Sequence, residues 1–129
     1  MSTIETITAA VVDILADILD LDPAQVTPET YVVRDLRAES IDLLEIGVAM
    51  QHRLDMEVDD DTLFLKNMRQ VLARAAKAGK PPEEAMAAEY PHLDRARIAE
   101  ILADREAGPV IKVRDLAAYA ADRAGEAED

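Results

Sequence analysis

An all-α fold is predicted by three features of the 129-residue sequence. Apolar residues recur at three- and four-residue spacing in several segments, which is the period of an amphipathic helix. Proline and glycine separate these segments. Only 3% of the residues are aromatic, so the core must consist of Ala, Val, Leu, Ile and Met, as is typical of small helical bundles. The length favours a single domain, over residues 1–125, followed by an acidic tail at 126–129.

Composition excludes several classes of function. The formal net charge of −13 argues against nucleic acid, because phosphate binding requires clustered Lys and Arg. The same charge favours basic protein partners, or it serves solubility alone. The absence of Cys excludes disulfides, thiolate metal sites and a Cys nucleophile. No apolar run is long enough to span a membrane and no signal peptide is recognisable, so we expect a cytoplasmic protein.

The first helix is expected from about Ser2 to Leu19, where Ser2 and Glu5 have the spacing of a capping box. Its apolar residues follow the helical period: Ile4, Ile7, Val11, Ile14, Leu15 and Ile18. Pro23 ends it, because proline disfavours helix in the residue before it. An irregular stretch follows from about Asp20 to Glu39. Its apolar residues predict that it packs across the bundle: Val26, Tyr31, Val32, Val33 and Leu36.

A second helix is expected from Ser40 or Ile41 to about Leu54. Ser40 is predicted as its N-cap, with an exposed hydroxyl above free backbone N–H groups. One apolar stripe is expected to be buried: Leu43, Ile46, Gly47, Met50 and Leu54. A second apolar line consists of Ile41, Leu44 and Val48, flanked by Asp42, Glu45 and His52. A helix that is apolar beyond one stripe has a second contact, which is either another helix of this chain or a partner.

A third helix is predicted from about Thr62 to Ala78. Residues 59–61 are all Asp and favour helix capping over a divalent metal, because no further ligand has recognisable spacing. The face opposite the apolar one is basic: Lys66, Arg69, Arg74 and Lys77. These cations either pair with the chain's own carboxylates or form a binding surface. After a break at residues 79–82, three further helices are expected at about 82–89, 93–103 and 113–123.

The segment around Ser40 is similar to the modification site of acyl carrier proteins. That family has Asp-Ser-Leu at the start of its second helix, commonly preceded by Asp-Leu-Gly. Here the residues are Asp35-Leu36-Arg37-Ala38-Glu39-Ser40-Ile41-Asp42. The similarity extends backward through residues 26–33 and the first helix, and forward through residues 44–58 and 113–116. The sequence departs from the family pattern at Arg37, Glu39, Ile41 and His52, and it has dozens of extra residues between Val58 and Val113.

The resemblance implies an acyl-carrier-protein-like helical bundle, enlarged by about two helices in the inserted region 59–109. It implies a monomeric carrier, not an enzyme, that holds acyl thioesters on 4′-phosphopantetheine. A phosphopantetheinyl transferase would move that group from coenzyme A to Ser40. The pathway would be specialised lipid, fatty-acid or polyketide synthesis. Enzymes with basic docking patches would recognise Asp35, Glu39, Ile41, Asp42, Leu44, Glu45 and Val48.

Two questions stay open at this level. The chain could instead be an unmodified helical interaction or regulatory module in which Ser40 only caps its helix. The inserted region could enlarge an apolar cavity lined by Phe64, Met68 or Leu72, or its basic face could bind a dedicated partner. His52 and His92 are too isolated in the sequence to suggest a metal site or a catalytic triad, so both are expected at the surface.

Overall fold

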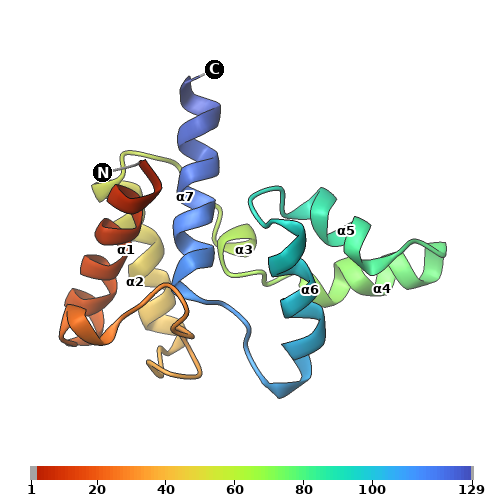
Figure 1. The fold of residues 1–129 in the computed structure, drawn as a ribbon, viewed down its shortest axis with the longest axis horizontal. Helices are drawn as coiled ribbons and strands as arrows, with labels where there is room; N and C mark the ends of the chain where they lie inside the picture. Colours follow the sequence, from red (N-terminus) through yellow and green to blue (C-terminus); the bar gives the residue numbers. More distant parts are fainter. Residues whose placement is uncertain (1–2, 129) are drawn as a thin grey trace.

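The computed structural model describes residues 3–128 and the side chains of residues 3–125. These residues form seven α-helices and two short 3-10 helices (Figure 1). In order they are α1 (Thr3–Leu19), η1 (Pro23–Gln25), α2 (Ser40–Arg53), α3 (Asp60–Leu63), α4 (Met68–Ala78), α5 (Pro82–Glu89), α6 (Arg95–Asp104), η2 (Arg105–Ala107) and α7 (Val113–Glu128). The all-α prediction is therefore confirmed. None of these helices is long and apolar enough to cross a membrane.

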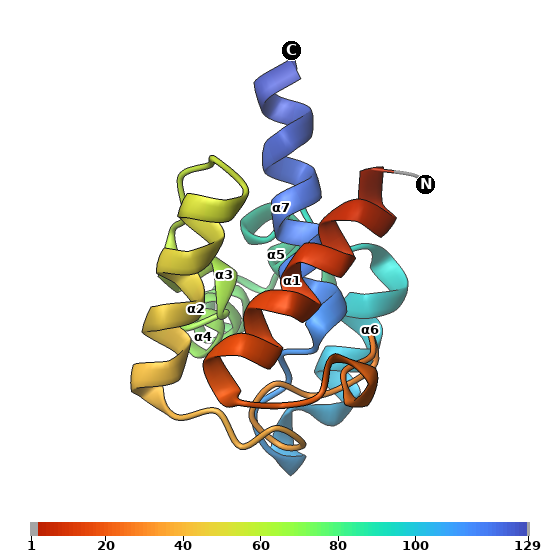
Figure 2. The same cartoon turned by 90° about the vertical axis from the view of Figure 1, so that its left-hand side faces the viewer.

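Helices from the two ends of the chain form one group. Helix α1 contacts α2 and α7, and Figure 2 shows α1 crossing in front of α7 with α2 beside it. The fully buried side chains of this group include Val11, Ile14, Leu15, Ile46, Met50 and Leu116. On α1 and α2 these residues come from the predicted apolar stripes, because only one side of each helix faces the core.

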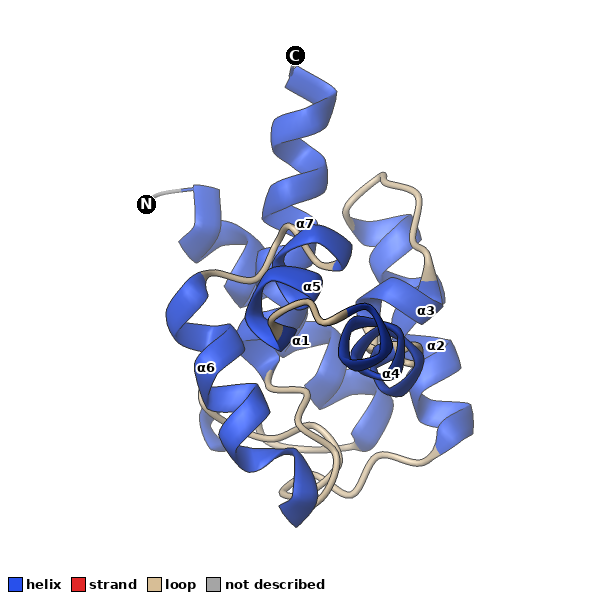
Figure 3. Ribbon diagram, turned by 90° about the vertical axis from the view of Figure 1, so that its right-hand side faces the viewer, coloured by secondary structure: helices blue, strands red, loops and turns tan. Residues whose placement is uncertain are grey.

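Helices α4, α5 and α6 form a second group. Helix α4 contacts α5 and α5 contacts α6, while the short α3 contacts α2 and α7. Figure 1 shows α4 and α5 extending away from α1, α2 and α7, and Figure 3 shows α4 end-on beside α5 and α6. Met86, Tyr90, Ile98 and Ile101 of this group belong to the same core cluster as the α1 and α2 residues. The inserted region is thus packed onto the rest of the protein through a shared core.

The prediction of one continuous helix from Thr62 to Ala78 is wrong. Helix α3 ends at Leu63, α4 begins at Met68, and Leu65 between them has a left-handed φ of 53°. Leu63, Phe64 and Leu65 are all buried, with exposed fractions of 0%, 8% and 5%. Three consecutive residues point to different sides of a helix. A break in the helix allows all three side chains to enter the core.

The irregular stretch between α1 and α2 is held by backbone hydrogen bonds to the segment before α7. Val32 N donates to Ile111 O at 3.0 Å, and Val113 N donates to Thr30 O at 3.0 Å. Val26 and Val32 are buried. The prediction that this stretch packs across the bundle is therefore confirmed.

The helix ends differ from the predicted ones near the C-terminus. Helix α6 begins at Arg95, and α7 continues to Glu128, beyond the predicted end at about Arg123. Gly79 has the predicted breaking role, because it adopts a left-handed φ of 69° directly after α4. The predicted capping residue Ser2 and the last tail residue Asp129 lie outside the described residues.

Candidate functional site

Ser40 is the first residue of α2, and its side chain is exposed at the junction between loop and helix. The N-cap is the preceding residue, Glu39, so the prediction that Ser40 is the N-cap is wrong. Glu39 N donates to Asp42 Oδ2 at 2.8 Å, and Leu43 N donates to Glu39 O at 3.0 Å. The Ser40 hydroxyl makes no hydrogen bond to any described residue. Helix capping therefore does not explain a serine at this position.

The second apolar line of α2 is not covered by another helix of the described chain. Ile41, Leu44 and Val48 are 57%, 52% and 47% exposed. With Glu45 they occupy positions i, i+3, i+4 and i+7, which lie on one face of a helix. Three exposed large apolar residues on one face are typical of a protein–protein contact. The structure thus decides against internal packing of this line.

The four predicted acidic recognition residues lie on α2 or in the loop before it, and two of them also hold the backbone. Asp35 Oδ2 accepts a hydrogen bond from Tyr31 N at 2.9 Å, which closes the turn before Ser40. Asp42 accepts from Glu39 N as described above, and it is half-buried. Glu39 and Glu45 are exposed. The structure therefore brings all seven predicted recognition residues to the loop before α2 and to α2 itself.

A pocket of about 330 Å³ lies directly beside Ser40. Its walls are almost entirely apolar: Val33, Ala38, Leu43, Phe64, Leu65, Met68, Pro109, Val110 and Ile111, with Ser40 itself. Phe64 and Met68, two of the three residues expected to line a cavity, are in this wall, whereas Leu72 is not. Leu72 instead lines a neighbouring hollow that shares Met68. The inserted region thus forms a large part of the pocket beside the serine.

A buried ion pair fixes one wall of this pocket. Arg97 and Asp115 are 2% and 1% exposed, and Arg97 Nε and Nη2 donate to the Asp115 carboxylate at 2.8 Å each. Arg97 Nη2 also donates to Val110 O at 2.6 Å, and Lys112 N donates to Asp115 Oδ2 at 2.8 Å. Burial alone would lower the pKa of Arg97, but the bonds to Asp115 raise it overall. The pair therefore holds the residues on both sides of Ile111.

A second polar cluster holds the segment that leads into the same wall. Arg34 Nη1 donates to Asp104 Oδ1 at 3.0 Å, and Arg34 Nη2 donates to Gly108 O at 2.8 Å. The Tyr31 hydroxyl donates to Asp104 Oδ2 at 2.6 Å. The hydrogen bonds from Arg34 and then Tyr31 lower the pKa of Asp104. Gly108 has a φ of 138° and lies against Arg34, so a side chain here would be strained and crowded.

His92 is half-buried, and the prediction that it lies at the surface is wrong. Its ring lies edge-on between Tyr90 and Tyr119, with centroids 6.3 and 5.4 Å away. Its Nε2 is buried without a hydrogen-bond partner among the described residues. Burial lowers the pKa of His92. His52, in contrast, is exposed on α2 as predicted.

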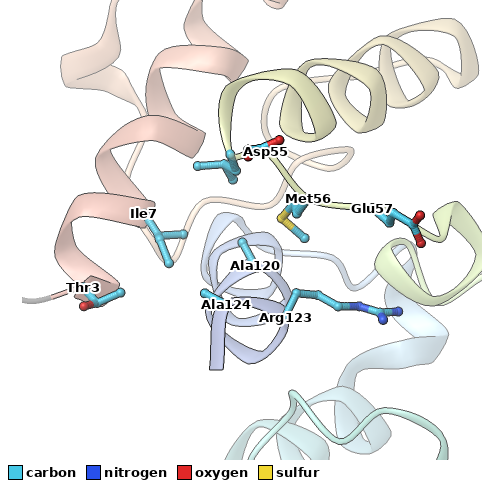
Figure 4. Close-up of a pocket in the computed structure, with 9 residues that line it drawn as sticks. Thr3, Ile7, Asp55, Met56, Glu57, Ala120, Arg123 and Ala124 are labelled. Atoms are coloured by element: carbon cyan, nitrogen blue, oxygen red, sulfur yellow. The ribbon is translucent and has the colours of Figure 1, made fainter. Parts of the chain in front are cut away.

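A larger pocket, of about 630 Å³, lies at the other end of α2. Figure 4 shows its residues coming from α1, from the loop after α2 and from α7. Helix α2 has 14 residues, and at 1.5 Å per residue its two ends are about 20 Å apart. This pocket therefore does not adjoin Ser40.

Comparison with known proteins points to one family. The model of the phosphopantetheine attachment site matches residues 9–75. The acyl carrier protein of Bdellovibrio bacteriovorus is 37% identical over 69 residues, which is 53% of this chain and 88% of that protein. The meromycolate extension acyl carrier protein of Mycolicibacterium smegmatis is 31% identical over 88 residues, which is 67% of this chain and 89% of that protein. No solved structure gives a significant match.

The helical fold and these matches define a carrier that uses a phosphopantetheine group. The chain belongs to the acyl carrier protein family. Its cofactor is 4′-phosphopantetheine, and proteins of this family carry groups without catalysing their chemistry. The expected cofactor and the expected absence of enzymatic activity are therefore confirmed. Helices α5 to α7 lie beyond the residues that the family model matches.

Several residues of the site were missed from the sequence. The pocket is lined by Val33 and Ala38 and also by Val110 and Ile111, although more than half of the chain separates the first two residues from the last two. Their apolar character was the only available signal, and it does not reveal which of them meet. Asp115 lies in the family-like segment 113–116, but Arg97 belongs to no recognisable motif, so no signal in the sequence showed that the two residues pair.

Proposed function

We propose that Ser40 carries 4′-phosphopantetheine and that the protein presents acyl thioesters to biosynthetic enzymes of specialised lipid, fatty-acid or polyketide synthesis. The observation that carries the proposal is the Ser40 hydroxyl, which is exposed and makes no hydrogen bond to any described residue. It also lies within the residues that the phosphopantetheine attachment model matches. An exposed hydroxyl at the N-terminus of a helix, without a hydrogen bond to the described residues, is accessible to a second enzyme that modifies it.

The attachment reaction balances with coenzyme A as the donor. Ser40 Oγ would form a bond to the phosphorus nearer pantetheine, and the bond from that phosphorus to the other phosphate would break. Adenosine 3′,5′-bisphosphate would leave, and the hydroxyl proton would pass to a base of the transferase. The N-terminus of α2 favours the negative charge of the resulting phosphodiester. The thiol of the bound cofactor would supply the thioester.

The apolar pocket beside Ser40 supports a sheltering role for the acyl group. Phe64, Leu65 and Met68 of the inserted region contribute to its wall. Burial of apolar chain is favourable by about 25 cal/mol per Å². The relative from M. smegmatis is named for meromycolate extension. We therefore infer a long acyl chain as the cargo class, and a pocket enlarged by the inserted region to receive its first carbons.

The exposed face of α2 is the proposed docking surface for the transferase and for acyl-handling enzymes. Ile41, Leu44 and Val48 would supply apolar contact. Asp35, Glu39, Asp42 and Glu45 would attract basic patches on these enzymes, because opposite charges steer association. The carboxylates near Ser40 oppose a bound phosphate, so attraction of partners is their proposed role. We further propose that the protein acts as a monomer in the cytoplasm.

Intact-mass measurement after incubation with coenzyme A and a broad-specificity transferase tests the attachment. We expect one phosphopantetheine adduct on the wild type and none on Ser40→Ala. Ser2 is the one other serine in the sequence, so Ser2→Ala is the matched control and should be modified fully. An unmodified wild type, or an adduct on Ser40→Ala, would refute the proposal. The first result would favour the unmodified interaction module instead.

The docking surface is tested by charge reversal. Glu45→Lys should lower kcat/KM of the transferase about tenfold, because it places a cation against a basic patch. Asp17 is exposed on α1 and is not one of the residues of the proposed docking surface, so Asp17→Lys makes the same charge change as a control. Equal losses for the two variants would show that total charge, and not the α2 face, governs recognition.

A further inference from the structure

A basic surface lies on and around α4, in a protein that is otherwise acidic. It consists of Lys66, Arg69, Arg74, Lys77 and Lys80, which are all exposed, and we call it the α4 basic surface. Residues 62–82 contain these five cations and no Asp or Glu, whereas the whole chain has 27 acidic and 14 basic residues. Positive charge is therefore concentrated in residues 62–82, and the overall composition of the chain does not account for it.

The cations of this surface are not paired within the described chain. No carboxylate of a described side chain lies within 4.0 Å of any of the five, although six such ion pairs occur elsewhere. Lys66 Nζ instead lies over the aromatic ring of Phe64, 6.0 Å from the ring centroid. The expectation that these cations neutralise the chain's own carboxylates is therefore wrong.

The fold does not require these cations either. Helix α4 is held by the opposite face, where Val71 and Ala75 are buried. Arg74 and Lys77 are three residues apart, and like charges at that spacing repel each other on a helix. A charged surface that forms no ion pair with the described residues of its own chain is suited to binding a partner.

The chemistry of the surface favours an acidic protein over a membrane or a nucleic acid. Gln70, Ala73 and Ala76 are exposed between the cations, so no large apolar side chain is available to insert into a bilayer. Small alanines allow another protein to approach closely. The net charge of −13 repels an extended anionic polymer or membrane. A compact acidic patch meets only the local cations, because charges beyond about 8 Å are screened at physiological salt.

The position of α4 connects this surface to the carrier site. Met68, the first residue of α4, lines the pocket beside Ser40, and Arg69 follows it. We propose that the α4 basic surface is a docking site for an acidic patch of a partner protein, distinct from the α2 face that attracts basic partners. A protein bound there lies beside whatever Ser40 carries. This inference goes beyond the proposed function, since it does not require Ser40 to be modified.

Chemical-shift mapping of the isotope-labelled protein with a Glu-rich helical peptide tests this site. We expect the shifted amides to fall within residues 66–80 and the affinity to decrease with salt. Arg69→Gln/Lys77→Gln should weaken binding about tenfold. Arg37→Gln/Arg95→Gln removes two other exposed cations and is the matched control, with affinity within about twofold of the wild type.

Equal weakening by the two double variants, or shifts outside α4, would overturn the proposal. Tighter binding to phosphatidylglycerol vesicles or to duplex DNA than to the peptide would overturn the assignment of a protein partner. The same titration on Ser40→Ala should give an unchanged affinity. Its outcome is therefore independent of the intact-mass experiment, and failure of one proposal can be told from failure of the other.

Discussion

The carrier-like part of the molecule and the inserted region are built differently. The carrier-like part (residues 3–58 and 113–128) brings α1, α2 and α7 together from both ends of the chain, whereas α4, α5 and α6 of the inserted region (59–109) pack mainly against their neighbours in sequence. The exposed faces of the two parts also differ in charge. The face of α2 is acidic and apolar, whereas the face of α4 is basic. Both helices contribute to the pocket beside Ser40, α2 through Ser40 and Leu43 and α4 through Met68. The inserted region therefore adds a basic surface to an otherwise acidic protein, on the helix that contributes Met68 to this pocket.

The junction between the two parts relies on polar contacts as well as on apolar packing. Arg97 of α6 binds Asp115 of α7, and Asp104 binds Arg34 and Tyr31. Such contacts require particular geometry, so they define how the inserted region sits on the carrier-like part. Three predictions test this junction, beginning with the largest expected effect.

Loss of the Arg97–Asp115 pair should weaken the junction most. Arg97→Ala leaves the Asp115 carboxylate buried without its partner, which costs about 3–5 kcal/mol of unfolding free energy. Arg95→Ala on the same helix is the control. Arg95 is exposed, so its removal should change the free energy by less than about 0.5 kcal/mol. Urea unfolding measures both values.

The double variant Arg97→Met/Asp115→Leu separates loss of the pair from loss of one partner. Removal of both charges with retention of volume should recover much of the stability. If Arg97→Ala lowers the free energy of unfolding no more than Arg95→Ala does, the Arg97–Asp115 pair does not hold the two parts together.

The close approach of α2 and α3 gives a smaller effect. A Cβ on Gly47 would lie 2.5 Å from Asp60 Oδ1, so Gly47→Ala forces that carboxylate to move. Alanine in a helix interior otherwise stabilises by about 1 kcal/mol relative to glycine. We expect this gain in the Asp60→Ala background and not in the wild type. A double-mutant cycle from urea unfolding measures the difference. Equal effects in both backgrounds would contradict the close contact.

A pH dependence of stability should arise from His92, with the smallest effect of the three. Burial lowers its pKa below 6.5, Asp115 and Asp122 raise it, and Arg123 lowers it. When the pH lies between the lowered pKa of His92 in the folded state and its pKa in the unfolded state, the unfolded state binds more protons. Stability should therefore be fully present above pH 6.5 and should fall as the pH decreases through that value.

Urea unfolding at pH 8 and pH 5.5 measures this dependence. His92→Gln should reduce the difference between the two pH values, and His52→Gln should leave it unchanged because His52 is exposed. The lowered pKa values of Glu29 and Asp104 also reduce stability as the pH falls, but only near and below the ordinary carboxyl pKa. If His92→Gln leaves the difference unchanged, the destabilising protonation occurs elsewhere.

The all-α class, most of α1, α2 and α5, and the serine at the head of α2 could be predicted from the amino-acid sequence. These features depend on residues close together in the chain: helical spacing, proline and glycine breaks, and the motif from Asp35 to Asp42. The exposed apolar line on α2 was visible, but whether another helix covers it was not.

The remaining features depend on contacts between segments that are distant in the chain. The break between α3 and α4 follows from a core that accepts Leu63, Phe64 and Leu65 together. The pocket beside Ser40 depends on the meeting of residues 33–43, 64–68 and 109–111, and the buried position of His92 depends on Tyr119 of α7. Burial and pairing are properties of contacts between distant residues. Local periodicity carries no information about which of those contacts form.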